Sequence, residues 1–166
     1  MTAPDVVTEM FAAYRTSLDS LEGKLGKAFS DAVDLLGGMS GTVVVCGMGK
    51  SGLVGAKITA TLTSTGTPSV FLHPAEAMHG DLGIVRKGDV IILISNSGET
   101  EEITRLLPAL KRLAVRIIAL VGNVDSTMAR AADICLDAAI DKEACPLNLA
   151  PTTSTLAALV LGDALA

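Results

Sequence analysis

The sequence has few aromatic residues and no excess of positive charge. Its 166 residues contain no tryptophan, one tyrosine and three phenylalanines, and 13 lysines and arginines stand against 18 aspartates and glutamates. Proteins that bind nucleic acids use basic grooves for the phosphates and aromatic side chains for stacking on bases. Both features are missing, so we expect no nucleic acid partner.

Cysteine and long apolar runs are also scarce. Cys46, Cys135 and Cys145 are odd in number and irregularly spaced, which favours reduced intracellular thiols over a disulfide framework or a zinc site. No stretch approaches the roughly 18 uninterrupted apolar residues of a membrane span, and the first five residues lack the features of a secretion signal. We therefore expect a cytoplasmic protein without a membrane partner.

Residues 1–40 predict a helical segment that precedes the main domain. Between residue 5 and about residue 27, apolar side chains recur with the 4-3-4-3-4 spacing of one helix face. They are Val7, Phe11, Tyr14, Leu18, Leu21 and Leu25. A second apolar series continues to Gly37-Gly38, which predict a helix stop. We favour packing of this segment on its own domain, and packing on a neighbouring subunit is the alternative.

Residues 41–166 predict a doubly wound α/β domain. Short β-branched runs without polar alternation are typical of parallel strands that are buried on both faces. They occur at Thr42–Cys46, Ser69–Leu72, Asp89–Ile94, Arg116–Val121 and Ile134–Leu136. Helical patterns occur at Ser51–Ser64, Glu99–Leu113, Ser126–Ala131 and Ser154–Ala166. Such folds bind ligands at the carboxyl ends of the strands, so the loops there hold the candidate site.

The turn after the first strand has a glycine pattern suited to an anion. Gly47-Met-Gly-Lys-Ser-Gly52 lets the backbone approach a ligand, and the helix that it opens supplies free N–H donors. A dinucleotide site would need an acidic residue where His73-Pro74 stands, and a P-loop would need glycine in place of Val44. A cation at Lys50 opposes the helix dipole by about 0.3–1 kcal/mol, which indicates an anionic neighbour or a solvated lysine.

The turn after the third strand is rich in hydroxyl groups. Ser95-Asn-Ser-Gly-Glu-Thr100 combines three hydroxyl side chains with one glycine at a helix start. Such a turn can bind phosphate oxygens, and we name it the phosphate cup. The alternative is a plain helix cap, with Ser97 as the N-cap and Glu99, Glu101 and Glu102 near the positive end of the dipole. Two such turns on adjacent strands favour the phosphate site.

Motifs of these kinds occur in a fixed order through residues 41–166. They are Gly47-Met-Gly-Lys-Ser-Gly52, Ser64-Thr-Gly-Thr-Pro68, His73-Pro74, His79-Gly-Asp-Leu-Gly83, Ser95-Asn-Ser-Gly-Glu99, Lys142-Glu-Ala-Cys-Pro-Leu147 and Ala150-Pro-Thr-Thr-Ser-Thr155. Together they resemble the sugar isomerase (SIS) domain, most closely that of the arabinose-5-phosphate isomerases. The resemblance implies a three-layer α/β/α sandwich with a five-stranded parallel sheet, similar to flavodoxin and Rossmann folds. It also implies a homotetramer with active sites at subunit boundaries.

The resemblance further implies an aldose–ketose isomerase that interconverts D-ribulose 5-phosphate and D-arabinose 5-phosphate without a cofactor. It implies phosphate contacts from Ser51, Ser95, Ser97 and Thr100. It implies catalytic roles for Lys50, Glu102 and Glu143. It favours lipopolysaccharide synthesis as the use of the product, with capsule formation and sugar-alcohol metabolism as alternatives.

The chemistry of this reaction explains the residue types. Moving a carbonyl between the first two carbons requires a base to remove a proton, an enediol, and return of the proton to the neighbouring carbon. We assign the base to Glu143, ring opening or hydroxyl proton transfer to Glu102, and stabilisation of the oxyanion to Lys50. Spacing alone does not choose Glu102 over Glu99 or Glu101, and the alternative for Glu143 is a solvated loop charge.

Two histidines and a hydroxyl-rich helix start complete the candidate site. His73 and His79 follow the second strand, and we expect structural or substrate-binding roles for them. In the resembled family the position of His73 can take a divalent ion, which we regard as non-essential. The last helix opens at Thr152–Thr155, where we expect Thr153 and Ser154 both to cap the helix and to contact sugar hydroxyls.

The chain departs from the family in one respect. Family members carry a further catalytic histidine in a Ser-His-Pro-Gly-Gly segment after the final helix, and usually a pair of CBS domains, and the 166 residues include neither. Because the final helical pattern still runs at Ala166, we expect the natural protein to continue.

A second functional hypothesis, besides the isomerase, is a sugar-phosphate-sensing SIS module without catalysis, of the kind joined to DNA-binding domains. A third is a nucleotide-binding regulatory domain.

Overall fold

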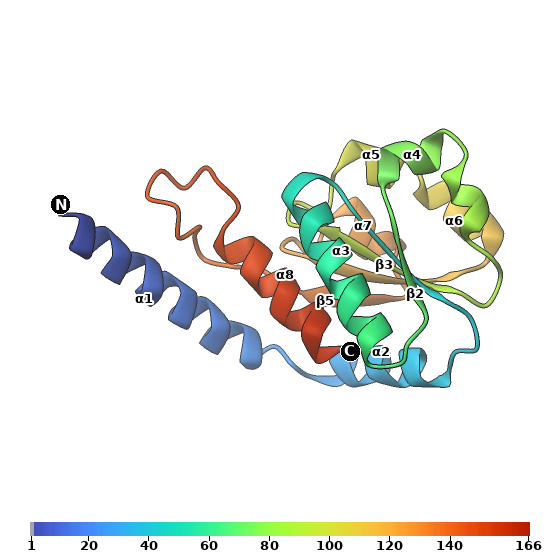
Figure 1. Ribbon diagram of the computed structural model, residues 1–166, viewed down its shortest axis with the longest axis horizontal. Coiled ribbons are helices and arrows are strands. Elements are labelled where there is room, and N and C mark those ends of the chain that lie inside the picture. Colours follow the sequence, from blue (N-terminus) through green and yellow to red (C-terminus); the bar gives the residue numbers. More distant parts are fainter. Residues whose placement is uncertain (1) are drawn as a thin grey trace.

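Five parallel strands form the central sheet of the computed structural model, which describes residues 2–166 (Figure 1). They are β1 (Val43–Gly47), β2 (Ser69–Leu72), β3 (Val90–Ser95), β4 (Arg116–Val121) and β5 (Ile134–Asp137). Their order across the sheet is β2-β1-β3-β4-β5, and every neighbouring pair is parallel. The predicted α/β fold is confirmed, and each predicted strand agrees with the observed one to within a residue at either end.

The strands lack polar alternation because the sheet is covered on both faces. Successive side chains of a strand point to opposite faces, so Val43 and Val45 enter one hydrophobic core while Val44 and Cys46 enter the other. β1 and β3 are buried at every position. Burial also raises the pKa of the Cys46 thiol to about 12, which makes it an inert core residue.

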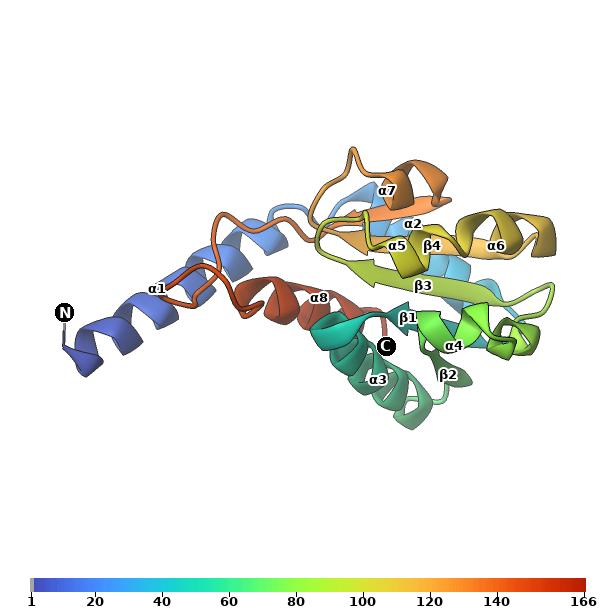
Figure 2. The same cartoon turned by 90° about the horizontal axis from the view of Figure 1, so that it is seen from above.

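Helices cover both faces of the sheet (Figure 2). They are α1 (Ala3–Glu22), α2 (Lys27–Gly38), α3 (Gly49–Ser64), α4 (Pro74–Met78), the 3₁₀ helix η1 (Asp81–Ile84), α5 (Glu101–Thr104), α6 (Leu107–Leu113), α7 (Thr127–Ala131) and α8 (Thr153–Ala164). Helices α2, α3 and α8 supply one core, and α4 to α7 supply the other. The result is the three-layer sandwich that the sequence predicts.

Two helix predictions need correction. The single helix expected over Glu99–Leu113 is two short helices, α5 and α6, because Pro108 in the first turn of α6 has no N–H to continue the hydrogen-bond ladder. Between β2 and β3 the chain also forms α4 and η1, which carry no periodic signal in the sequence because each is about one turn long.

The N-terminal segment differs more from its prediction. The helix expected to run to about residue 27 ends at Glu22, and α2 begins after a short connection that contains Gly23 and Gly26. Only the C-terminal part of α1 packs on the domain, where Leu21 is buried. The rest projects from the domain (Figure 1) and leaves Val7 50% and Phe11 58% exposed. No residue of α1 before Ser17 is buried, and packing of its first half on the chain's own domain or on a neighbouring subunit stays a prediction.

The strand order places the two candidate ligand-binding turns side by side. β1 lies between β2 and β3, so the connections that leave β1 and β3 diverge and open a crevice between their carboxyl ends. The register pairs Gly47 with Ile94, which brings the Gly47 turn next to the phosphate cup. Among residues 2–166, no helix is long and apolar enough to cross a membrane.

Close packing of α3 against α8 generates a first prediction. A Cβ atom on Gly162 of α8 would overlap with the fully buried side chain of Ile58 on α3. We expect Gly162→Ala to lower the free energy of unfolding by about 1–3 kcal/mol, because overpacking outweighs the better helix propensity of alanine. Urea unfolding followed by circular dichroism measures the change.

The matched control is Gly37→Ala on α2, where an added Cβ meets nothing within 4 Å. This variant should keep or slightly raise the free energy of unfolding. Equal stability of the two variants would contradict the close packing of α3 and α8.

Candidate active site

The turn after β1 is shaped by its glycines. Gly49 adopts a left-handed backbone with φ of 57°, and a Cβ on Gly52 would lie only 2.6 Å from the carbonyl oxygen of Gly47. α3 starts at Gly49, and its N-cap Met48 makes no side-chain capping hydrogen bond. The turn therefore presents the positive end of α3 at the carboxyl edge of the sheet, where an anion is stabilised.

Lys50 and Ser51 lie in the first turn of α3. Lys50 is exposed, and no residue among 2–166 gives it a side-chain hydrogen bond or an ion pair. The anionic neighbour that its position predicts is thus not supplied by the described part of this chain. Ser51 is half-buried. Their predicted roles, in stabilising an oxyanion and binding phosphate, stay predictions.

The phosphate cup gathers its hydroxyl groups at the end of β3. The Oγ of Ser95 lies 2.7 Å from Oγ1 of Thr100 and 3.4 Å from Oγ of Ser97. The Gly98 N–H donates to Ser95 Oγ over 3.1 Å. Gly98 has a φ of 66°, and a Cβ on it would overlap with the Ser126 side chain. The structure thus brings the three predicted phosphate ligands of this turn together.

The capping alternative for this turn needs correction. Ser97 is not the N-cap of α5, because that helix starts three residues later than an N-cap at Ser97 requires and its N-cap is Thr100. The Ser97 hydroxyl instead accepts the N–H of Glu99 over 3.2 Å within the turn. The exposed Ser97 and the half-buried Thr100 remain accessible to a ligand.

The three glutamates beside the cup have different surroundings. Glu101 forms an ion pair with Arg105. Glu99 accepts the backbone N–H of Thr127 over 2.7 Å, and this bond is the main cause that holds the pKa of its carboxyl below the ordinary value. Glu102 is half-buried and has no hydrogen-bond or ion-pair partner among residues 2–166. Glu99 and Glu101 thus have partners within the chain, Glu102 has none among the described residues, and the catalytic role of Glu102 stays a prediction.

Glu143 is fixed at the start of α8. Its Oε2 accepts the N–H of Thr152 over 2.7 Å, the hydroxyl of Thr152 over 3.1 Å and the N–H of Ser154 over 3.2 Å. Its Oε1 accepts the hydroxyl of Ser154. The alternative of a solvated loop charge is therefore wrong, because the carboxylate caps the positive end of a helix.

These contacts set the charge of Glu143. Burial by itself raises the pKa of the carboxyl. The hydrogen bonds that it accepts from the side chains and backbone N–H groups of Ser154 and Thr152 lower the pKa, and together they outweigh burial. The pKa therefore lies below the ordinary value of 4.5, and the group is ionised at neutral pH. An ionised carboxylate is the form that can accept a proton.

The hydroxyl groups at the start of α8 hold the preceding loop. Thr153 is fully buried, and its Oγ1 accepts the N–H of Ala144 over 2.8 Å. Thr152 is the N-cap residue, but its side chain makes no capping bond to α8, because Glu143 takes that place. Contacts of Thr153 and Ser154 with a sugar stay predictions, and both hydroxyls already have partners within the chain.

The two histidines flank α4. His73 is its N-cap residue at the end of β2, and its Nδ1 is buried without a hydrogen-bond partner. His79 is exposed at the other end of the helix. Within the described residues, no group of three or more His, Cys, Asp or Glu side chains could hold a metal ion. A divalent ion at His73 stays a prediction, for which the residues between 2 and 166 supply no cluster of further ligands.

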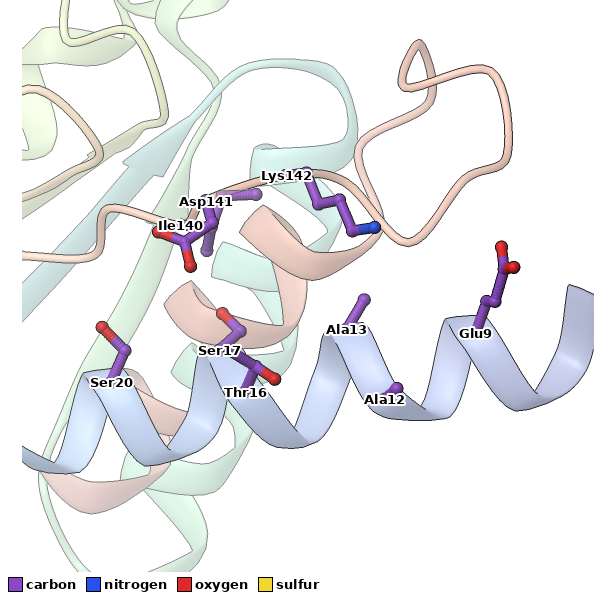
Figure 3. A pocket seen from close by; sticks show the side chains of 9 residues that line it. All are labelled: Glu9, Ala12, Ala13, Thr16, Ser17, Ser20, Ile140, Asp141 and Lys142. Carbon is purple, nitrogen blue, oxygen red and sulfur yellow. The ribbon is translucent and has the colours of Figure 1, made fainter.

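A cavity of about 280 Å³ lies between α1 and the loop after β5 (Figure 3). Its walls include Glu9 and Ser17 of α1 and Asp141 and Lys142 of the loop. A smaller cavity of about 110 Å³ continues beside it and reaches Glu143. Sequence reasoning missed this cavity, because it forms between segments more than a hundred residues apart.

The SIS domain model matches residues 39–166 of this chain. The chain belongs to the SIS domain family. The match begins next to the boundary at residue 41 that the sequence predicts and extends through all the motifs quoted for it.

Curated relatives of this SIS domain are closely similar to it. The chain is 58% identical over 152 residues to a Pseudomonas aeruginosa protein named arabinose 5-phosphate isomerase KdsD, an alignment that covers 92% of this chain and 47% of the relative. It is 55% identical over 158 residues to the Escherichia coli K12 protein of the same name, covering 95% and 48% respectively. The chain thus spans about half the length of the curated relatives it matches.

A solved structure has the same architecture. It is an Escherichia coli CFT073 protein in complex with arabinose 5-phosphate, which is 39% identical and superposes with a TM-score of 0.93. The alignment covers 99% of this SIS domain and 89% of that chain. The short helices that the sequence did not predict are therefore part of a fold shared over nearly the full length of both chains.

The cap formed by Glu143 generates a prediction for stability. Because the folded-state pKa lies below 4.5, this stabilisation is complete above that value and is lost as the pH falls through the folded pKa. We expect Glu143→Gln to lower the free energy of unfolding by about 1 kcal/mol at pH 7. The difference from the unsubstituted chain should shrink as the pH falls below 4.5, as measured by urea unfolding at several pH values.

Glu9→Gln is the control, since Glu9 is an exposed glutamate that lines the same cavity from α1. It should leave the free energy of unfolding unchanged over this range. A Glu143→Gln difference that persists at low pH would contradict the charged cap.

Proposed function

We propose that this SIS domain is the catalytic domain of an aldose–ketose isomerase that interconverts D-ribulose 5-phosphate and D-arabinose 5-phosphate. The observation that carries the proposal is the convergence of the Ser95, Ser97 and Thr100 hydroxyls beside the turn that bears Lys50. The names of the Pseudomonas and Escherichia relatives support the same substrate pair. The substrate's phosphate would lie between the two turns, bound by the cup hydroxyls and by Ser51 at the positive end of α3.

The proposed mechanism is a proton transfer through an enediol. Glu143, ionised at neutral pH, removes the proton from the carbon beside the carbonyl and returns it to the neighbouring carbon. Lys50, whose cation has no partner within residues 2–166, stabilises the oxygen that becomes negatively charged. Glu102 assists ring opening or the transfer of hydroxyl protons, and none of these steps requires a cofactor.

The rest of the site is proposed from position in the fold. His73 and His79 would contact the sugar, with a divalent ion at His73 as a non-essential addition.

Residues 1–40 would form a helical segment separate from the catalytic domain of residues 41–166. The exposed Val7 and Phe11 support packing of that segment on a neighbouring subunit in a homotetramer. We place the enzyme in the cytoplasm, with lipopolysaccharide synthesis as the use of its product.

The decisive experiment follows aldose formation from D-ribulose 5-phosphate. It uses the natural protein, including any residues that its gene encodes after Ala166. We expect Lys50→Met and Glu102→Gln each to lower kcat/KM by roughly 10²- to 10⁴-fold, because each removes a group that acts on the reacting atoms. Circular dichroism verifies that the variants are folded.

Matched controls come from the same two helices. Lys57→Met removes an exposed lysine that pairs with Asp163, and Glu101→Gln removes the carboxylate that pairs with Arg105. Both should keep normal turnover. Binding of the sugar phosphate without any turnover by the unsubstituted protein would support the sensing module instead. Tight nucleotide binding without a response to sugar phosphates would contradict both hypotheses.

A further inference from the structure

The two oxygens of the Glu143 carboxylate have unequal surroundings. Oε2 accepts three hydrogen bonds, two from backbone N–H groups and one from the Thr152 hydroxyl. Oε1 accepts one, from the Ser154 hydroxyl. An ionised carboxylate offers about four lone-pair positions, roughly two on each oxygen. Oε2 is therefore saturated by protein donors, and Oε1 keeps a free position.

The donors belong to a rigid part of the molecule. Ser154 is only 6% exposed and lies in the first turn of α8, which packs along α3. The backbone on the other side of the carboxylate is also fixed. The N–H of Glu143 itself donates to Oδ1 of Asn148 over 2.9 Å, and the next N–H, that of Ala144, donates to Thr153. The carboxylate thus has a defined position and a defined orientation.

We propose that Ser154 and Thr152 are positioning residues for proton transfer, which orient Glu143 so that its Oε1 is the atom that takes and returns the substrate proton. The inference rests on the proposed function and deepens it. It assigns to the two hydroxyls a role through Glu143, in place of the sugar contact that the sequence predicts for Ser154. The carbon-bound proton moves to Oε1, the C–H electron pair becomes the C=C bond of an enediolate, and the carbonyl electron pair moves onto oxygen beside Lys50. The same proton then returns to the adjacent carbon, and a hydroxyl proton moves from one substrate oxygen to the other, the transfer proposed for Glu102, so that the new carbonyl forms.

Other ionisable groups near Glu143 are few. Glu9 faces the same cavity from α1, and Lys142 and Cys145 lie on the loop. Hydrogen bonds from the backbone of Ala150 and its neighbours lower the pKa of the Cys145 thiol. The pH dependence of Glu143 therefore has to be measured against variants of these groups, and Glu9→Gln and Cys145→Ala serve for that purpose.

The test compares pH profiles of kcat/KM for the natural protein, Ser154→Ala and Thr152→Val. Both variants remove hydrogen bonds that favour the ionised carboxylate, so the acid limb of the profile should move to higher pH. We expect a loss of roughly tenfold in kcat/KM on the acid side and a smaller loss on the plateau, the size expected for one hydrogen bond to a charged group. KM should change less than kcat.

Two further variants separate positioning from mere folding. Thr152→Ser retains the hydroxyl and should restore the natural profile. Thr59→Val removes a helix hydroxyl of α3 that donates only to the carbonyl of Gly55, and it should leave the profile unchanged. A uniform loss at all pH values in Ser154→Ala and Thr152→Val, without movement of the acid limb, would overturn the inference.

A direct titration distinguishes this inference from the proposed function. The ¹³Cδ resonance of Glu143, identified by its loss in Glu143→Gln, reports protonation of the carboxyl whether or not the enzyme turns over. Its midpoint should move upward in Ser154→Ala relative to the natural protein. An unmoved midpoint in an active enzyme overturns the positioning role alone. No turnover by the natural protein overturns the proposed function, and the proton-transfer role of Oε1 with it.

Discussion

Burial of a parallel sheet on both faces is the constraint on which the rest of this structure depends. It requires strands that are apolar at every position, and parallel strands end at one common edge. The order β2-β1-β3-β4-β5 then makes the connections from β1 and β3 diverge, which leaves their two turns as neighbours. The glycines after β1 and the hydroxyl groups after β3 become one candidate phosphate site only because of that order.

A second arrangement connects stability with chemistry at the start of α8. The same carboxylate that accepts the N–H groups of Thr152 and Ser154 at the start of this helix is the proposed base of the reaction. Helix capping usually employs the N-cap side chain, but here Glu143, nine residues before Thr152, takes over that function. A group with both roles has to remain ionised for the fold and available for the reaction, and the unequal donors on its two oxygens meet both needs.

Much of the fold could be predicted from the sequence because strands and long helices leave periodic or continuous apolar signals. Val43 to Cys46 are buried without exception, and the apolar run there locates β1 directly. Helices α4 and η1 could not be predicted in this way, since one-turn elements carry no period. The break between α5 and α6 has a signal of a different kind, Pro108, which the periodic pattern does not register. The partner of the first half of α1 could not be predicted for another reason: an amphipathic stripe such as that of Phe11 is the same whether it packs on the chain itself or on another molecule.

In the candidate site, too, features with local contacts could be predicted from the sequence, and features that depend on distant contacts could not. Residue types and spacing predicted the hydroxyl groups of the phosphate cup, whose contacts are local. They could not choose among Glu99, Glu101 and Glu102, because Thr127, which binds the carboxylate of Glu99, becomes its neighbour only in the folded chain. The partner of Glu101, Arg105, lies only four residues further along the chain. The sugar contact expected for Thr153 stays a prediction, and residue types did not reveal that its hydroxyl also accepts the N–H of Ala144 from the preceding loop.

Hydrogen bonds from the residue after β4 and from α7 fix the backbone of the phosphate cup, and this has a thermodynamic consequence. Asn96 accepts the N–H of Gly122 after β4, Gly98 accepts the N–H of Met128 in α7, and the carboxylate of Glu99 accepts the N–H of Thr127. The loop is thereby held in its shape from outside by three bonds that a ligand does not have to form. The phosphate proposed to bind here would meet hydroxyl groups that are already ordered, so little conformational entropy would be lost on binding and more of the contact energy would remain as affinity.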